Sequence, residues 1–133
     1  MIGYDRLGSN GRFGNQLFQY ASLRGIAEHR GYDWCIPPSD QSSQSNYAIH
    51  DAFEMKHLSE KNIGFINNDV SPRAYYSFEN LCALNPGIKN RTESSYRFDE
   101  DLFDNFEDDT NLDGYLQSYK YFQHIEDKIL EEF

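Results

Sequence analysis

Three glycines at three-residue spacing form the stretch with the clearest potential for chemistry: Gly8, Gly11 and Gly14. They follow a short apolar run and precede a long amphipathic segment, so we expect a turn between a strand and a helix. Glycine lets the backbone take positive φ or approach a ligand closely. Unpaired N–H groups at the start of the following helix would suit a phosphate or another anion. Such turns also serve only to pack a strand against a helix, and spacing alone leaves both interpretations open.

The glycine spacing differs from that of known nucleotide-binding loops. It reads G-x-x-G-x-x-G, whereas the dinucleotide fingerprint reads G-x-G-x-x-G. The acid that follows, Asp33, stands at the start of the expected second strand, whereas a ribose-binding acid stands at that strand's carboxyl end. No Lys-Ser/Thr pair follows the last glycine. A nicotinamide or P-loop site is therefore disfavoured.

Other reactive residue types lack the spacing that metal binding or nucleophilic catalysis needs. Residues 109–114 match the first half of a calcium loop, but Lys120 stands where the bidentate Glu should be. Cys35 and Cys82 have no CxxC spacing, so we expect buried thiols in a reducing compartment. The acidic run 99–109 is typical of a solvated face. The histidines lie far apart and are expected to be surface or packing residues: His29, His50, His57 and His124.

The glycine turn is expected to lie inside a strand–helix–strand unit. Residues 2–7 and 32–36 are the two strand candidates, and apolar residues recur at helical spacing over 15–30. Asn15 is placed to cap the helix start, and Gly31 to end the helix. This order predicts an α/β fold with parallel strands and flanking helices.

The remaining segments carry weaker patterns. A loop is expected over 39–45, a short helix within 48–58 and a short strand within 63–70. Further expected elements are extended stretches at 74–78 and 95–98, a helix within 99–109, a strand at 111–116, and a final helix capped by Ser118 with the apolar stripe Phe122, Ile125, Ile129 and Phe133.

Charge and composition exclude several classes of protein. The net charge of −10 opposes non-specific nucleic-acid binding, which depends on Lys and Arg. No apolar run is long enough to span a bilayer. Asp5 and Arg6 interrupt the position where a signal peptide needs an apolar core, so we expect a cytoplasmic protein.

Two separate segments resemble signatures of one enzyme family. Residues 11–21, GRFGNQLFQYA, are similar to the N-terminal signature of family 11 glycosyltransferases, the α-1,2-fucosyltransferases. Residues 112–122, LDGYLQSYKYF, resemble the family's L-x-GYxQSxKYF segment. The two segments stand in the family's order and spacing, and the resemblance covers essentially the whole chain.

The resemblance implies a fold, a reaction and a site. The fold would be the Rossmann-like N-terminal domain of a GT-B glycosyltransferase. The reaction would transfer fucose from GDP-fucose to a galactoside with inversion, with no cofactor and no obligatory metal. The implied donor-binding residues are Arg12, Gly14, Asn15 and Gln16, in a loop shaped by Gly8 and Gly11. The catalytic base stays unassigned.

The chain departs from the family in one respect. The H-x-R-R-x-D signature, whose Arg holds the donor diphosphate in the family, is absent. We therefore expect residues 1–133 to form a single N-terminal domain that lacks the nucleotide-binding half and has no measurable transferase activity alone. The implied partners are the nucleotide sugar and a galactoside, once a C-terminal half or a split partner chain completes the enzyme.

Other interpretations stay open. The chain could be a non-catalytic module that binds sugars or a partner protein, or form a dimer. Peripheral contact of the chain with the inner membrane is another open interpretation, because enzymes of glycan assembly often lie on a membrane surface. An oxidoreductase-like nucleotide binder is a third class, disfavoured by the glycine spacing.

Overall fold

The computed structural model describes residues 1–7, 13–37, 65–66, 69–70, 72–85 and 89–132. Its centre is a four-stranded sheet in the order β2-β1-β6-β5, and every neighbouring pair is parallel. The strands are β1 (Ile2–Gly3), β2 (Trp34–Cys35), β5 (Asn90–Thr92) and β6 (Asn111–Asp113). The predicted α/β fold with parallel strands is confirmed. The expected loop at 39–45 and helix within 48–58 lie outside the described residues.

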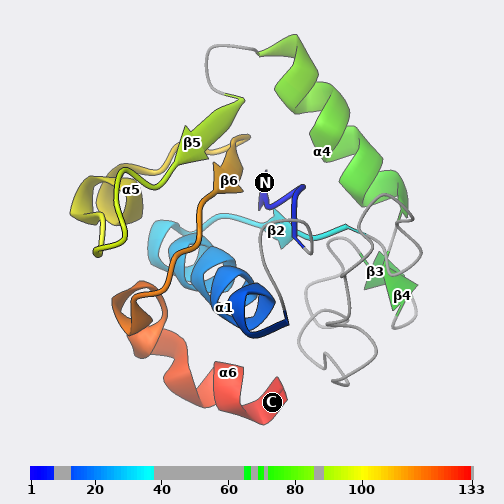
Figure 1. The fold of residues 1–133 in the computed structure, drawn as a ribbon. Helices are drawn as coiled ribbons and strands as arrows, with labels where there is room; N and C mark the ends of the chain where they lie inside the picture. The colour runs from blue at the N-terminus through cyan, green and yellow to red at the C-terminus, as the bar shows by residue number, and fades with distance from the viewer. Residues whose placement is uncertain (8–12, 38–64, 67–68, 71, 86–88, 133) are drawn as a thin grey trace.

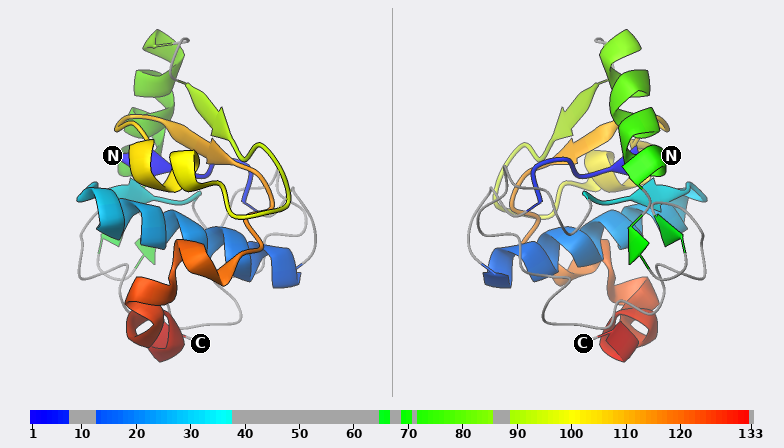
Figure 2. Two further views of the ribbon diagram at one scale, coloured as in Figure 1. Left: turned by 90° about the vertical axis from the view of Figure 1, so that its left-hand side faces the viewer. Right: turned by 90° about the vertical axis from the view of Figure 1, so that its right-hand side faces the viewer.

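Helices cover both faces of the sheet (Figures 1 and 2). The α-helices are α1 (Phe13–Arg30), α4 (Pro72–Leu84), α5 (Glu100–Asn105) and α6 (Glu126–Glu132). Two 3-10 turns, η1 (Tyr119–Tyr121) and η2 (Gln123–Ile125), precede α6. Helix α4 lies on one side of the sheet and α1 on the other, with η1, η2 and α6 beyond α1 (Figure 2). None of the helices in the described ranges is both long and apolar enough to cross a membrane.

Helix α1 begins two residues earlier than the sequence indicates. It starts at Phe13, so Asn15 lies within the first turn, and the prediction that Asn15 caps the helix is wrong. A capping residue type is a weak signal for a helix start, because most helical stability in proteins comes from tertiary contacts. The predicted end is confirmed. Gly31 has φ 76°, and the N–H of Tyr32 donates to the carbonyl of Ala27 at 2.8 Å, which closes a Schellman motif.

Helix α1 is buried on more than its apolar stripe. Every residue from 21 to 27 is buried, and so are the polar residues Gln16 and Gln19. The cause is the second layer, in which η1 and η2 cover the side of α1 that faces away from the sheet. The guanidinium of Arg24 lies over the ring of Trp34, 5.5 Å from its centroid.

Several other predictions change in the structure. Residues 74–78 form part of α4 instead of an extended stretch, because Phe78 and Cys82 then lie one turn apart and pack with Cys35. Residues 95–97 form bends and Phe98 has no strand pairing, and β5 at 90–92 was not predicted because its side chains are polar. The expected strand within 63–70 is a short antiparallel hairpin, β3 (Phe65–Ile66) and β4 (Asp69–Val70).

The C-terminal predictions hold in part. The strand expected over 111–116 is β6, and the helix expected within 99–109 is α5, capped by Asp99. Ser118 caps η1 and not the final helix. The segment expected to be one final helix is η1, η2 and the short α6. Ile125 and Ile129 are buried as predicted, Phe122 is half-buried, and Phe133 lies outside the described residues.

Helix α1 and the segment that contains η1 approach closely at Gly25. A Cβ at this position would lie 1.8 Å from the backbone oxygen of Tyr121 and 2.9 Å from the Cα of Phe122. We therefore expect Gly25→Ala to lower the free energy of unfolding by about 3 kcal/mol or more, because backbone must move to admit the methyl group. Urea unfolding followed by circular dichroism measures the change.

Gly14→Ala is the matched control in the same helix. No described atom lies within 4 Å of a Cβ there, so helix propensity should make the variant more stable by up to about 1 kcal/mol. Equal effects of the two substitutions would contradict this layer contact.

Candidate functional site

The two sequence motifs meet through a side-chain hydrogen bond. The Nε2 of Gln117 donates to the Oδ1 of Asn15 at 2.7 Å, although the residues are 102 positions apart. Asn15 lies in the first turn of α1, which follows β1, and Gln117 follows β6. Because β1 and β6 are neighbouring parallel strands, both residues belong to the carboxyl edge of the sheet. Open α/β sheets bind ligands at this edge.

The contact orients two further polar groups. With its Oδ1 engaged, the Asn15 amide presents Nδ2 as a donor, and the Gln117 amide presents Oε1 as an acceptor. The first N–H groups of α1 lie beside them and carry the partial positive charge of a helix start. This arrangement suits a ligand that combines hydroxyl groups with negative charge.

The structure separates the residues predicted to bind a donor. Gly14 is exposed and Asn15 is half-buried, whereas Gln16 is fully buried and supports the turn from within. The remaining predicted site residues lie outside the described ranges: Gly8, Gly11 and Arg12.

Leu116 is held in an unfavourable backbone conformation directly before Gln117. It is fully buried and has φ 53°, which is rare for a bulky residue. Its N–H donates to the Oε1 of Glu93 at 3.2 Å, and its carbonyl accepts from the Oγ of Ser22 at 3.2 Å. Such strain costs about 1–3 kcal/mol and persists only where surrounding contacts impose it. Here it directs the chain so that Gln117 reaches Asn15.

Tyr121 connects three elements beneath this site. Its side chain is fully buried, and its hydroxyl donates to the Oε2 of Glu93 at 2.6 Å while accepting from the N–H of Asp99 at 2.8 Å. Glu93 follows β5, and Asp99 caps α5 by accepting from the N–H of Leu102 at 3.0 Å. Sequence patterns gave no signal for Glu93, because it lies in a polar stretch without periodicity.

Burial shifts the acid–base properties of this cluster. It raises the pKa of the Tyr121 hydroxyl above its ordinary range, and the hydrogen bond to Glu93 adds to the shift. Burial also raises the pKa of the Glu93 carboxyl, although hydrogen bonds from Tyr121 and Leu116 oppose this. Burial alone would raise the pKa of Asp99, but hydrogen bonds from Leu102 and Ser94 outweigh it and lower that pKa.

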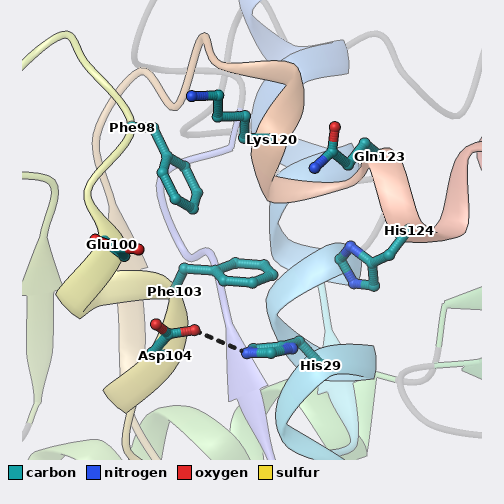
Figure 3. Close-up of a pocket in the computed structure, with 8 residues that line it drawn as sticks. All are labelled: His29, Phe98, Glu100, Phe103, Asp104, Lys120, Gln123 and His124. Carbon is teal, nitrogen blue, oxygen red and sulfur yellow. Dashed lines mark hydrogen bonds and ion pairs between the residues drawn. The ribbon is translucent and has the colours of Figure 1, made fainter.

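A separate hollow of about 340 Å³, the histidine hollow, lies between α1, α5 and the 3-10 turns (Figure 3). Its lining residues are His29, Phe98, Glu100, Phe103, Asp104, Lys120, Gln123 and His124. His29 pairs with Asp104 at 3.0 Å and stacks on Phe103 with ring centroids 4.0 Å apart. His124 contacts the carbonyl of Gly25 through Nε2 at 2.9 Å.

The contacts and place of the histidine hollow favour a structural role. His29 is in the last turn of α1, and this helix runs back to the amino edge of the sheet, away from the edge where ligands bind. Both described histidines make packing contacts, as expected from the sequence. Within the described ranges, no group of three or more His, Cys, Asp or Glu side chains is arranged to hold a metal.

Comparisons of the chain with models of protein families, with curated proteins and with solved structures find no match. The fold and site define an α/β domain with a polar site at the carboxyl edge of a parallel sheet.

Removing the Tyr121 hydroxyl tests the cluster that supports this site. Tyr121→Phe removes the donor to the Oε2 of Glu93 and the acceptor for the N–H of Asp99, so we expect a loss of about 1–3 kcal/mol in the free energy of unfolding. Tyr119→Phe is the matched control, because that side chain is 61% exposed.

Tyr121→Phe also changes how the free energy of unfolding depends on pH above about pH 10. The folded pKa of Tyr121 is raised, so its contribution is complete below the unfolded pKa of about 10 and is lost as pH rises beyond it. The unfolding free energy of the wild type should fall more steeply between about pH 10 and 12 than that of Tyr121→Phe. Equal slopes in denaturant titrations at these pH values would contradict the assignment.

Proposed function

We propose that this chain provides the Rossmann-like N-terminal domain of a GT-B α-1,2-fucosyltransferase, which moves fucose from GDP-fucose to a galactoside hydroxyl with inversion. The observation that carries the proposal is the hydrogen bond between Asn15 and Gln117. Each residue belongs to one of the two motifs that resemble the family. Their direct contact at the carboxyl edge of the sheet supports interpreting both motifs as parts of one site.

The reaction needs two kinds of group. The acceptor oxygen attacks C1 of fucose from the face opposite the diphosphate, and the bond from C1 to the departing oxygen breaks with its electron pair leaving on GDP. The acceptor proton passes to a base, and hydrogen-bond donors stabilise the charge that develops on the diphosphate. The start of α1 and the Asn15 amide supply donors of this second kind, and Arg12 is proposed to add a cation. The base stays unassigned.

Space beside Asn15 is consistent with donor binding. Gly14 is exposed, and a Cβ there would meet no described atom within 4 Å. Among the described residues, nothing blocks a ligand from the backbone at Gly14. Gln16 is buried in the same turn, so we propose that it supports the donor-binding turn from the protein interior.

The proposed site is one wall of a cleft between two domains. In a GT-B enzyme the second wall comes from a C-terminal domain that clamps the diphosphate, in the same polypeptide or on a partner chain. Charge-assisted hydrogen bonds of that clamp contribute strongly to binding of the donor and the transition state. We therefore propose that residues 1–133 alone do not turn over GDP-fucose measurably.

A non-catalytic module that binds sugars is the second candidate. It is favoured by Tyr96 and Tyr115, two exposed aromatic side chains that lie together beside the sheet edge. Aromatic faces bind the apolar faces of sugars in such modules as well as in enzymes. The two candidates differ in whether fucose is transferred.

The test assays these residues together with their C-terminal domain, supplied by the same polypeptide or by a partner chain, with GDP-fucose and lactose. This assembly is the complete product. We expect fucosyl-lactose to form, and Asn15→Ala to lower kcat/KM by about 10–100-fold through the loss of a donor to the nucleotide sugar. Asn105→Ala is the matched control, because Asn105 is exposed at the end of α5 and bonds only locally to Asp101 among the contacts of the described chain. No transfer by the complete product, or equal rates for the two variants, would refute the proposal.

A further inference from the structure

A second hollow of about 420 Å³ opens at the carboxyl ends of β5 and β6, the ligand-binding edge of the sheet. We call it the tyrosine hollow. Its lining residues come from the ends of the two strands and the segments that follow them: Thr92, Glu93, Ser94, Ser95, Tyr96, Asp113, Gly114 and Tyr115. Neither sequence motif accounts for its β5 side.

Two tyrosines form an aromatic wall of the tyrosine hollow. Tyr96 is 83% exposed and Tyr115 is 41% exposed, although both rings are large and partly apolar. Their centroids are 6.3 Å apart and their planes are tilted by 30°, so the two rings are neighbours with roughly parallel planes. Aromatic faces kept in solvent next to a hollow indicate a binding surface, and their hydroxyls also bond to polar ligands.

The charge of the tyrosine hollow selects against anions. Glu93 and Asp113 are its charged lining residues, and its lining holds no Lys, Arg or His. A diphosphate or a phosphosugar would meet repulsion here. A carboxylate has about four lone-pair sites, so Glu93 can accept from a ligand hydroxyl in addition to Tyr121 and Leu116. The lining therefore fits a neutral ligand rich in hydroxyl groups.

The wall of the tyrosine hollow is fixed by local hydrogen bonds. The N–H and Oγ of Ser94 both donate to the Oδ2 of Asp99, at 3.2 and 2.9 Å. The N–H of Arg97 donates to the Oγ of Ser95 at 3.2 Å, which fixes the bend that carries Tyr96. A preformed wall reduces the entropy lost when a ligand binds.

We propose that the tyrosine hollow binds a neutral pyranoside, with one sugar face on Tyr96 and Tyr115 and its hydroxyls directed to Glu93 and Asp113. The choice of a galactoside rests on the proposed function, in which this hollow is the acceptor subsite. Galactose suits an aromatic wall because its axial 4-hydroxyl leaves the opposite ring face apolar.

The experiment titrates the ¹⁵N-labelled chain with methyl β-D-galactopyranoside and, separately, with GDP. We expect the galactoside to shift the backbone amides of Ser95, Gly114 and Tyr115, with a dissociation constant in the millimolar range. Tyr96→Ala should weaken this binding by at least about fivefold, from the loss of one aromatic contact. Tyr119→Ala is the matched control, an exposed tyrosine outside the tyrosine hollow, and should leave the affinity unchanged.

Three outcomes would overturn the inference: no shift with the galactoside, shifts at the same amides with GDP instead, or equal affinities of the two tyrosine variants. The transfer assay tests the proposed function separately from this binding experiment. Galactoside binding in the tyrosine hollow without fucose transfer by the complete product would retain this inference and refute the transferase. Fucose transfer with an acceptor KM unaffected by Tyr96→Ala would retain the transferase and refute this inference.

Discussion

The structure depends on the position of Tyr121 between α1 and the end of the sheet. Its backbone oxygen occupies the space that a side chain at position 25 would need, so α1 and the 3-10 turns approach closely only because residue 25 is glycine. Its hydroxyl joins Glu93 at the end of β5 to Asp99 at the start of α5. Buried polar groups of this kind stabilise one arrangement only when each has its partner. The segment from β6 to η1 is thereby fixed along α1.

This fixation places the polar site. Glu93 bonds both to Tyr121 and to the N–H of Leu116, so the same carboxylate that satisfies the buried phenol also holds the strained residue before Gln117. The strain at Leu116 is offset by these contacts, and the gain is the approach of Gln117 to Asn15. Local rules are broken most often where a structure serves a function. The unfavourable φ of Leu116 next to a polar contact between two motifs fits that pattern.

The sequence predicted the parts of the fold that local signals determine. Gly31 ends α1 because a positive φ there favours glycine, and α5 lies within the acidic run 99–109, where apolar residues recur at helical spacing. The parallel βαβ unit follows from two short apolar runs around one long helix. Position 15 was misassigned because capping preference is weak beside the tertiary contacts that stabilise most helices.

Other features could not be predicted because they depend on partners distant in sequence. Phe78 belongs to a helix because it packs over Gly3 and beside Cys35, and no neighbour in the sequence indicates this. The polar strand β5 exists because β6 pairs with it. The sequence motifs indicated Asn15 as a site residue but did not show that Gln117 contacts it. The tyrosine hollow forms only when β5 and β6 lie side by side.

Asn15 and Gln117 are proposed to belong to one site for a nucleotide sugar. Titration of the ¹⁵N-labelled chain with GDP-fucose, followed at the side-chain amides of these two residues, tests this proposal most directly. The account predicts that both amides shift together along one binding curve, and that the exposed amides of Asn105 and Gln123 stay in place. Unchanged Asn15 and Gln117 amides at saturating GDP-fucose, or shifts at only one of them, would contradict it.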